Sequence, residues 1–175
     1  NKRGGKRAMT DCNRCLVQCL GAVVIGLLSS LLSAVLVAEE KSRWRYDFGD
    51  AKLAPATGYT RLDATCQYST KHGFGLLPSP GDKDRGVRQR RLAADGRLDT
   101  FVFDDGGTTF VQDLPDGIYY VSLAAGDAAY PSTVSISLNG VSLQLLAPTR
   151  RGEMIVVNGA QVEVSRGQLR VEVGG

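Results

Sequence analysis

"MIVVNGAQVEVSRGQLRVEV", residues 154–173, is the stretch that decides the fold class, because apolar and polar side chains alternate along most of it. A period of two places successive side chains on opposite faces of a β-strand. Asn158-Gly159 and Arg166-Gly167 interrupt the alternation with residues typical of tight turns. The stretch therefore predicts a three-stranded meander. Its expected cross-strand pairs are Val157 with Ala160, Ile155 with Val162, Val164 with Leu169, and Val162 with Val171, with Glu163 opposite Arg170 on the other face.

Residues 134–145 predict another hairpin, because Asn139-Gly140 is a strong two-residue hairpin signal between alternating runs. The expected pairs are Leu138 with Val141, Ile136 with Leu143, and Val134 with Leu145, which would make one face wholly apolar. Further turn signals occur at Asp95-Gly96, Asp105-Gly106-Gly107 and Pro115-Asp116-Gly117. Many short strands at turn spacing indicate a β-sandwich or a barrel.

The rest of the domain adds strands and one long loop. Residues 108–127, TTFVQDLPDGIYYVSLAAGD, predict a strand, a tight turn and a second strand with Tyr119, Val121 and Leu123 on one face. Earlier alternations place Trp44, Tyr46 and Phe48 on one face of a strand, and Leu62, Ala64, Cys66 and Tyr68 on one face of another. We expect the aromatic residues and Cys66 in the core. Residues 78–95 are polar and rich in Gly and Arg, which predicts a long loop.

An N-terminal apolar segment precedes this β-domain. Residues 15–38 carry no charge, and five Lys or Arg residues lie before them. This pattern is typical of a secretory signal, and 24 uncharged residues are also long enough to serve as a membrane anchor helix, which needs about 20. We therefore divide the chain into a signal peptide or anchor, residues 1–38, and a β-domain, residues 39–175. In either case the β-domain is expected outside the cytoplasm, secreted or membrane-anchored.

Charge and cysteine content exclude several classes of function. The whole chain has a net charge of +3, but residues 39–175 hold 16 Lys or Arg and 17 Asp or Glu, so the β-domain lacks the basic excess of a nucleic-acid binder. Cys66 is its single cysteine, which rules out a disulfide within it. The leader's Cys12-x-x-Cys15 has no second ligand pair, so we predict no zinc site.

No catalytic motif in the β-domain is complete. The sequence has no G-x-S-x-G nucleophile elbow, and in Gly126-Asp127-Ala128 an alanine stands where a Gly-Asp-Ser esterase has its nucleophile. The only histidine, His72, has Ser69 at the position three residues earlier, where such an esterase carries an aspartate. Two of the 17 acidic residues would suffice for glycoside hydrolysis, but most of them occupy turns. We predict no catalytic residue here.

Binding chemistry is better represented. Arginine guanidinium groups suit bidentate pairing with the carboxylates of an acidic polysaccharide, and aromatic rings can stack on sugar rings. The predicted ligand-binding residues are Tyr59, Tyr68, His72, Phe74, Arg85 and Arg88, and the alternative for the arginine run that continues through Arg90 and Arg91 is a solvated loop. A calcium ion could be held by Asp47, Asp50 or Asp127, but their spacing is not that of a calcium loop, so no cofactor is predicted and surface carboxylates are the simpler interpretation.

An ordered set of motifs over residues 43–175 resembles a known family. RYDFGDAKLAPATGYTRL, YSTKHGFGLLP, DRG, LDTFVF and TTFVQDLPDGIYYVSLAAGD follow one another. The set is similar to the N-terminal galactose-binding-like jelly-roll module of rhamnogalacturonan acetylesterase-like, pectin-degrading enzymes. Tyr46 stands where that family has Phe, and His72-Gly73-Phe74-Gly75 shifts its G-Y-G-F element. The resemblance implies an all-β sandwich, one further closing strand, and a Gly-Asp-Ser catalytic domain beyond Gly175.

Three hypotheses about function follow. The first is an exported, non-catalytic carbohydrate-binding module of a pectin-active carbohydrate esterase, which positions acidic plant-type polysaccharide for that hydrolase. The second is a membrane-anchored, malectin-like surface protein that binds sugar or a protein partner with no enzyme attached. The third is a structural spacer that binds no glycan. In each of them membrane contact is expected only through the N-terminal segment.

Overall fold

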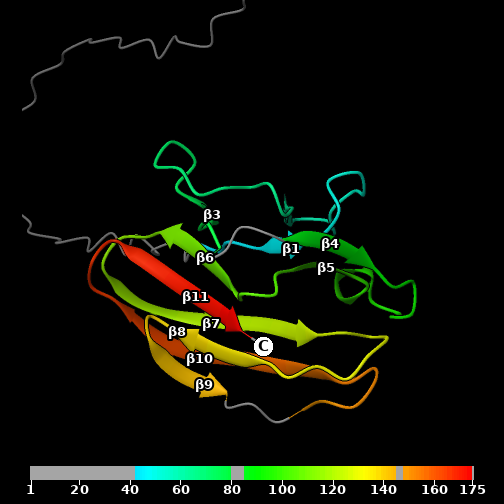
Figure 1. The fold of residues 1–175 in the computed structure, drawn as a ribbon. Helices are drawn as coiled ribbons and strands as arrows, with labels where there is room; N and C mark the ends of the chain where they lie inside the picture. Colours follow the sequence, from blue (N-terminus) through cyan, green and yellow to red (C-terminus); the bar gives the residue numbers. More distant parts are fainter. Residues whose placement is uncertain (1–41, 80–84, 145–147, 175) are drawn as a thin grey trace, which may run out of the picture. The chain divides into compact units, whose positions relative to one another are not determined.

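The computed structural model describes residues 42–79, 85–144 and 148–174, and this part of the chain is all-β (Figure 1). Its strands are β1 (Tyr46–Phe48), β2 (Thr60–Leu62), β3 (Phe74–Leu76), β4 (Gly86–Gln89), β5 (Thr100–Phe103), β6 (Thr108–Asp113), β7 (Gly117–Gly126), β8 (Ser135–Leu138), β9 (Val141–Gln144), β10 (Met154–Val164) and β11 (Gln168–Gly174). A single 3-10 turn, η1 (Gly96–Leu98), precedes β5. The expected signal or anchor lies outside the described residues. Within these ranges no helix is both long and apolar enough to cross a membrane.

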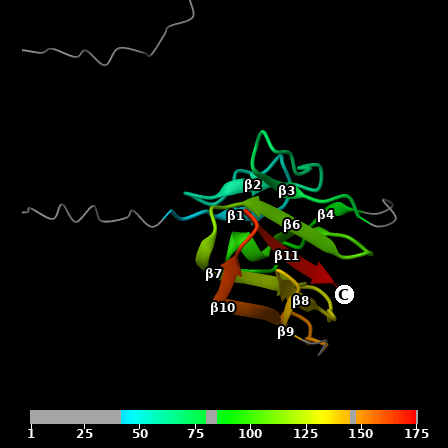
Figure 2. The ribbon, with the colours of Figure 1, turned by 90° about the vertical axis from the view of Figure 1, so that its left-hand side faces the viewer.

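Two packed layers of strands form the main body of the domain. The larger sheet is antiparallel with the order β3-β6-β11-β8-β9, and β7 and β10 pair antiparallel as a second sheet. Figures 1 and 2 show the β7–β10 pair lying against one side of the larger sheet. The core between them consists of Leu114, Leu138, Val162, Val164 and Leu169, with Tyr119 and Val121 packed against it. The predicted all-β sandwich is confirmed.

A second core cluster holds the N-terminal strands against the larger sheet. Leu62 and Leu76 are fully buried and pack with Phe110, and four half-buried residues, Tyr46, Phe48, Cys66 and Phe74, surround them. The prediction that Tyr46, Phe48 and Cys66 belong to the core is confirmed. Trp44 instead lies before β1 and is 43% exposed, with its ring 6.2 Å from that of Tyr119.

The predicted strand through Leu62, Ala64, Cys66 and Tyr68 is wrong after its first residue. β2 ends at Leu62 because Asp63 starts a turn: its Oδ1 accepts a hydrogen bond from the Thr65 backbone N–H at 2.6 Å. The Cys66 N–H then donates to the Asp63 carbonyl at 3.2 Å, which closes the turn. An aspartate that binds the backbone two residues ahead competes with strand pairing.

The hairpin at Asn139-Gly140 is confirmed next to its turn. Asn139 and Gly140 have φ angles of 48° and 80°, as a primed two-residue turn requires, and Leu138 pairs with Val141. A register shift then places Ile136 opposite Gln144 in place of Leu143, and Leu145 lies outside the described residues. Ile136 and Leu138 are buried, whereas Val141 and Leu143 are exposed, because they lie on the edge strand β9.

Asn158-Gly159 is a β-bulge, and the hairpin predicted there is wrong. β10 continues through both residues and pairs with β7 on either side, with Val157 opposite Leu123 and Ala160 opposite Val121. Asn158 and Gly159 therefore face the single residue Ser122, whose hydroxyl accepts from the Gly159 N–H at 2.9 Å and donates to Asn158 Oδ1 at 3.2 Å. A glycine at positive φ suits a bulge as well as a turn.

Replacing Ser122 with alanine should lower the free energy of unfolding by about 1 kcal/mol, because both hydrogen bonds of the bulge are lost. Ser142→Ala is the matched control, since Ser142 is an exposed strand residue whose hydroxyl makes no hydrogen bond to another described residue. Urea denaturation of the two variants measures the difference. Equal midpoints would show that the serine hydroxyl contributes nothing to the bulge.

Two tight turns connect strands of different sheets: residues 114–116 join β6 to β7, and residues 165–167 join β10 to β11. β11 does not pair with β10 but lies between β6 and β8, so the predicted pairs Val164–Leu169, Val162–Val171 and Glu163–Arg170 are wrong. Val164 and Leu169 meet across the core instead. The strand, turn and strand of residues 108–127 are present, with β6 and β7 in different sheets. The two crossings are joined, because Leu114 N–H donates to the Gly167 carbonyl and Gly167 N–H donates to Asp116, both at 2.9 Å.

The predicted long loop over residues 78–95 contains a strand. Gly86–Gln89 forms β4 and pairs antiparallel with β5, with Val87 opposite Val102. The loop prediction fails here because a single valine gives β4 almost no apolar signal. β4 gains a further contact with β5 because the Arg88 guanidinium lies over the ring of Phe103, and the polar character of the sequence does not reveal this contact.

Candidate functional site

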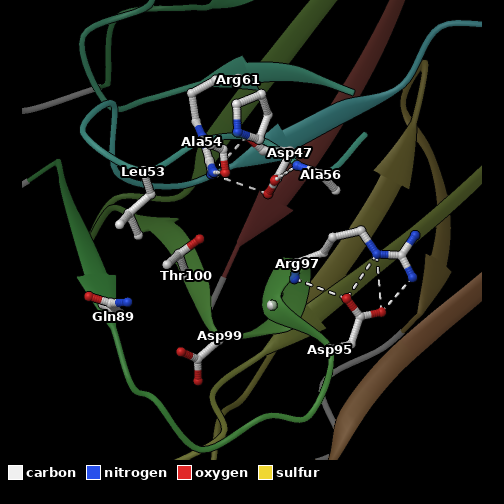
Figure 3. A pocket seen from close by; sticks show the side chains of 12 residues that line it. Asp47, Leu53, Ala54, Ala56, Arg61, Gln89, Asp95, Arg97, Asp99 and Thr100 are labelled. Atoms are coloured by element: carbon white, nitrogen blue, oxygen red, sulfur yellow. Dashed lines mark hydrogen bonds and ion pairs between the residues drawn. The ribbon is translucent and has the colours of Figure 1, made fainter. Parts of the chain in front are cut away.

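An open cavity of about 390 Å³ lies between the β1–β2 connection and the β4–β5 ribbon (Figure 3). This volume falls within the range of small-molecule sites in proteins. Its lining residues come from five places: β1, the connection that follows it, β2, the end of β4, and η1 with the start of β5. They are Asp47, Leu53, Ala54, Pro55, Ala56, Arg61, Gln89, Asp95, Gly96, Arg97, Asp99 and Thr100.

A buried ion pair holds one wall of the cavity. Arg61 Nη1 lies 3.2 Å from Asp47 Oδ1, and the Asp47 residue is 4% exposed. Asp47 also accepts from the Ala56 N–H at 3.0 Å, while Arg61 Nη2 donates to the Ala54 carbonyl at 3.0 Å (Figure 3). The two charged side chains therefore fix the connection that forms the wall. Buried charges persist only when paired in this manner.

Two buried polar atoms in the cavity lining have no protein partner in the part of the chain that the structure describes. They are Arg61 Nε, a donor, and Thr100 Oγ1, which can donate or accept. Thr100 is 4% exposed. Most buried polar atoms in folded proteins are hydrogen-bonded, so two orphaned atoms on residues that line one cavity are candidate contacts for a polar ligand. A sugar hydroxyl both accepts and donates, so its chemistry suits either atom.

An ordered ion pair forms the opposite rim. Arg97 binds Asp95 with a shortest N–O distance of 2.5 Å and also donates from Nη1 to the Tyr59 hydroxyl at 2.6 Å. Hydrogen bonds from the guanidinium of Arg97 and from the backbone N–H of Arg97 lower the pKa of Asp95 to about 2. The Asp95 carboxylate in turn raises the pKa of Arg97, with a smaller contribution from Tyr59. The rim is charged at neutral pH, but its charges cancel.

The remaining acid of the cavity lining is also engaged. Asp99 Oδ1 accepts from the Leu92 and Ala93 N–H groups at 2.5 and 3.0 Å, and the Ala93 bond is the main cause of its lowered pKa. The lining thus offers hydroxyl, amide and guanidinium groups without an unpaired cation. This arrangement suits an uncharged polar ligand better than an acid.

None of the six predicted binding residues lines this cavity, and Tyr59 is joined to it only through Arg97, which donates to the Tyr59 hydroxyl. Arg85 is bound to Asp104 at 3.1 Å and to the Leu77 carbonyl at 2.7 Å, so it serves the framework. Arg88 lies on the outward face of the β4–β5 ribbon, with its guanidinium carbon 3.9 Å from the centre of the Phe103 ring.

The other three predicted residues lie near β3. The Tyr68 hydroxyl donates to Asp113 at 3.0 Å and accepts from Gln168 at 2.9 Å, which makes it a structural link between strands. Phe74 packs with its ring 5.1 Å from that of Tyr46. His72 is exposed and its Nδ1 lies 3.0 Å from Ser69 Oγ. No carboxylate among the described residues is bonded to the His72 ring, so the pair lacks the third group of a catalytic triad.

The three acids considered for calcium do not meet. Asp47 is paired with Arg61 and Asp127 with Arg90, while Asp50 accepts from the Lys52 N–H in a local turn. Among residues 42–79, 85–144 and 148–174, no three His, Cys, Asp or Glu side chains gather as metal ligands would.

Sequence reasoning missed Arg61, Thr100 and Arg97 as site residues. One signal was available: Asp47 is a charged residue inside an aromatic strand, Tyr46-Asp47-Phe48, and a carboxylate there needs a buried cation. The identity of that cation as Arg61 depends on the parallel pairing of β1 with β2, which places Asp47 opposite Arg61.

The two-layer all-β fold defines a β-sandwich of the galactose-binding-like class. The chain belongs to the beta-agarase/YXIM esterase-like, galactose-binding domain-like family, whose model matches residues 44–174. It is 26% identical over 136 residues to the uncharacterized esterase YxiM of Bacillus subtilis, an alignment that covers 78% of this chain and 33% of that protein. The crystal structure of Bacillus subtilis YxiM matches with a TM-score of 0.55 and 25% identity, over 75% of this chain and 35% of that one.

The chain therefore spans about a third of the length of these relatives. The expected galactose-binding-like module of an esterase family is confirmed.

Proposed function

We propose that residues 42–174 form a non-catalytic module that binds polysaccharide and holds it near the catalytic domain of an exported, pectin-active carbohydrate esterase. The observation that carries the proposal is the cavity with two orphaned polar atoms, Arg61 Nε and Thr100 Oγ1. The ligand of this cavity is a neutral sugar unit, such as a galactosyl residue of a pectic side chain, because each charged side chain in the lining is already ion-paired or hydrogen-bonded within the protein.

The Tyr59 ring, next to the rim residue Arg97, supplies the apolar part of sugar recognition. This ring is half-buried, and the guanidinium carbons of Arg97 and Arg45 lie 5.3 and 5.8 Å from its centre. Cation–π contacts at these distances fix the orientation of the ring. A fixed aromatic side chain beside hydroxyl and amide groups is the combination on which sugar rings are recognised in concave sites.

Three observations support attachment to an esterase and export. A relative is named an esterase, and the chain matches about a third of it. None of the three Gly-Asp sequences continues with a nucleophilic serine, since Ala51, Lys83 and Ala128 follow them, so the chemistry belongs to another part of such a protein. Residues 1–38 read as a secretory signal or a membrane anchor, which would place the module outside the cytoplasm.

Thr100→Val tests the neutral-sugar site, since it removes the orphaned hydroxyl and keeps the shape of the side chain. Binding of the full chain to pectic galactan, measured by biolayer interferometry, should weaken about tenfold because a buried hydrogen bond to the ligand is lost. The variant should be at least as stable as the parent protein, since Oγ1 bonds to no described protein atom. Thr109→Val, on β6, is the control.

The proposal fails if the chain binds no galactan, which would favour the structural spacer, or if Thr100→Val and Thr109→Val bind as the parent does. Binding that depends on Thr100 in a full-length protein without an esterase domain would support the malectin-like alternative instead.

A further inference from the structure

We infer that the outward face of the β4–β5 ribbon is a second polysaccharide subsite, built to bind an anionic group, carboxylate or sulfate, on the sugar chain. The inference rests on the proposed function only in taking polysaccharide as the ligand class. The site is separate from the cavity, because Gln89 and Thr100, which line the cavity, lie on the opposite face of the same ribbon.

Alternation along the two strands creates this face. Arg88 is opposite Phe101 and Gly86 is opposite Phe103 in the register of β4 and β5. These four residues share one side because Gln89 and Thr100, their strand neighbours, point to the other. The ribbon therefore presents a row of aromatic rings and one guanidinium group outward.

Arg88 is held in place by stacking. A Cβ added at Gly86 would lie 2.8 Å from a Phe103 ring carbon, so only glycine lets the ring lie over β4. The guanidinium carbon of Arg88 then lies 3.9 Å from the centre of that ring. Stacking uses the flat face of the guanidinium and leaves its N–H edge available for two parallel hydrogen bonds to an oxyanion.

The guanidinium groups of two neighbouring arginines, Arg85 and Arg90, are not available to a ligand, because each is bound to an aspartate. Arg85 is bound to Asp104, and Arg90 makes two hydrogen bonds to Asp127, at 2.9 and 2.5 Å. Burial opposes ionisation of Asp127, but the hydrogen bonds from Arg90 and the Ala129 N–H outweigh it and lower the Asp127 pKa, with a weaker Coulombic contribution from Arg88. Among the described residues, no carboxylate forms an ion pair with Arg88. Arg88 is thus the exposed cation of the ribbon that is both ordered and free to take a ligand.

Exposed apolar side chains next to Arg90 extend the surface for a sugar chain. The Tyr130 ring lies 5.0 Å from the Arg90 guanidinium carbon and the residue is 61% exposed, while Leu92 is 57% exposed. Sugar rings pack on such aromatic faces, and the arginine beside them orients the charged substituent. A nucleic acid fits less well, because the balanced charge of residues 39–175 gives no basic track for phosphates.

The test compares polygalacturonate with its fully methyl-esterified form, which has the same backbone without the charge. The full chain should bind polygalacturonate at low salt, lose this binding as salt screens the contact, and bind the methyl ester at least tenfold more weakly. A sulfated galactan in the same assay distinguishes sulfate from carboxylate as the preferred anion. Arg88→Gln should weaken binding of the preferred anion about tenfold, and Arg88→Lys should restore only part of it, because lysine keeps the charge but cannot bind bidentately.

Arg151→Gln, in an exposed turn, is the matched control and should bind as the parent does. The inference is overturned if the methyl ester binds equally well, if Arg88→Gln has no effect, if Arg151→Gln loses as much, or if single-stranded DNA binds more tightly than either acidic glycan. Pectic galactan separates the two proposals: Arg88→Gln should leave galactan binding intact, and Thr100→Val should leave polygalacturonate binding intact. A thermal melt of each variant confirms that it is folded.

Discussion

Replacing Gly75 with alanine should destabilise the domain by roughly 3–5 kcal/mol, enough to leave much of the protein unfolded at room temperature. Gly75 lies in β3 with a φ of 146°, where side chains other than glycine are strained. A Cβ there would lie 2.4 Å from the Tyr68 backbone nitrogen and 2.6 Å from the Gln67 carbonyl carbon. Backbone atoms cannot move aside as a flexible side chain can, so β3 would have to separate from residues 67–68.

Gly73→Ala is the control for this effect. Gly73 has a φ of 72°, but the nearest atoms to an added Cβ belong to the Asp113 side chain at 3.7 Å, an ordinary contact distance. Its cost should be limited to backbone strain of about 1 kcal/mol. Urea unfolding followed by Trp44 fluorescence measures both variants. Equal losses would show that the close approach of the two backbones at Gly75 is not what requires glycine.

Removing the Asp47 carboxylate should produce the second largest effect. Asp47→Ala leaves the Arg61 guanidinium buried without its counterion and frees the Ala56 N–H, at a cost of about 3 kcal/mol. Because the same side chains position residues 54–56 in the cavity wall, galactan binding should be lost together with stability. Urea midpoints and biolayer interferometry give the two measurements.

Asp95→Ala breaks the ion pair on the opposite rim and provides the comparison. The Asp95 and Arg97 side chains are 38% and 46% exposed, so their interaction is weakened by solvent and the unfolding midpoint should barely change. Asp47→Asn, which keeps the shape of the side chain, should lie between the two alanine variants. If Asp95→Ala destabilises the protein as much as Asp47→Ala, burial does not determine the strength of these ion pairs.

Sequence patterns predicted which face of each strand is buried better than they predicted which strands pair with one another. Alternation correctly placed Val162 and Val164 of β10 and Leu169 of β11 on the buried side, but it paired β10 with β11 as a hairpin. A glycine turn reverses the chain whether the next strand continues the same sheet or enters the opposite one. What decides between the two is the distribution of apolar surface over both layers, which is a property of the whole domain and not of residues 165–167.

The site was less predictable for a related reason. Tyr59 was identified as an isolated aromatic residue, whereas its partner Arg97 follows 38 residues later in the chain and meets it only through η1. The orphaned Thr100 hydroxyl is invisible in a sequence, since being without a partner depends on which other atoms surround it. Arg88 was identified for its charge, but the ring of Phe103, which orders it, was not.

The place of β11 in the larger sheet determines when that sheet can form during synthesis. β11 is hydrogen-bonded to β6 on one side and to β8 on the other, yet it follows every other strand that the structure describes. Until β11 leaves the ribosome, β6 and β8 each lack the strand that pairs with them in the finished sheet. Unpaired edges of this kind invite contacts with other chains. The larger sheet is completed only after residues 168–174 have emerged, so the domain closes in one late step that joins its two halves.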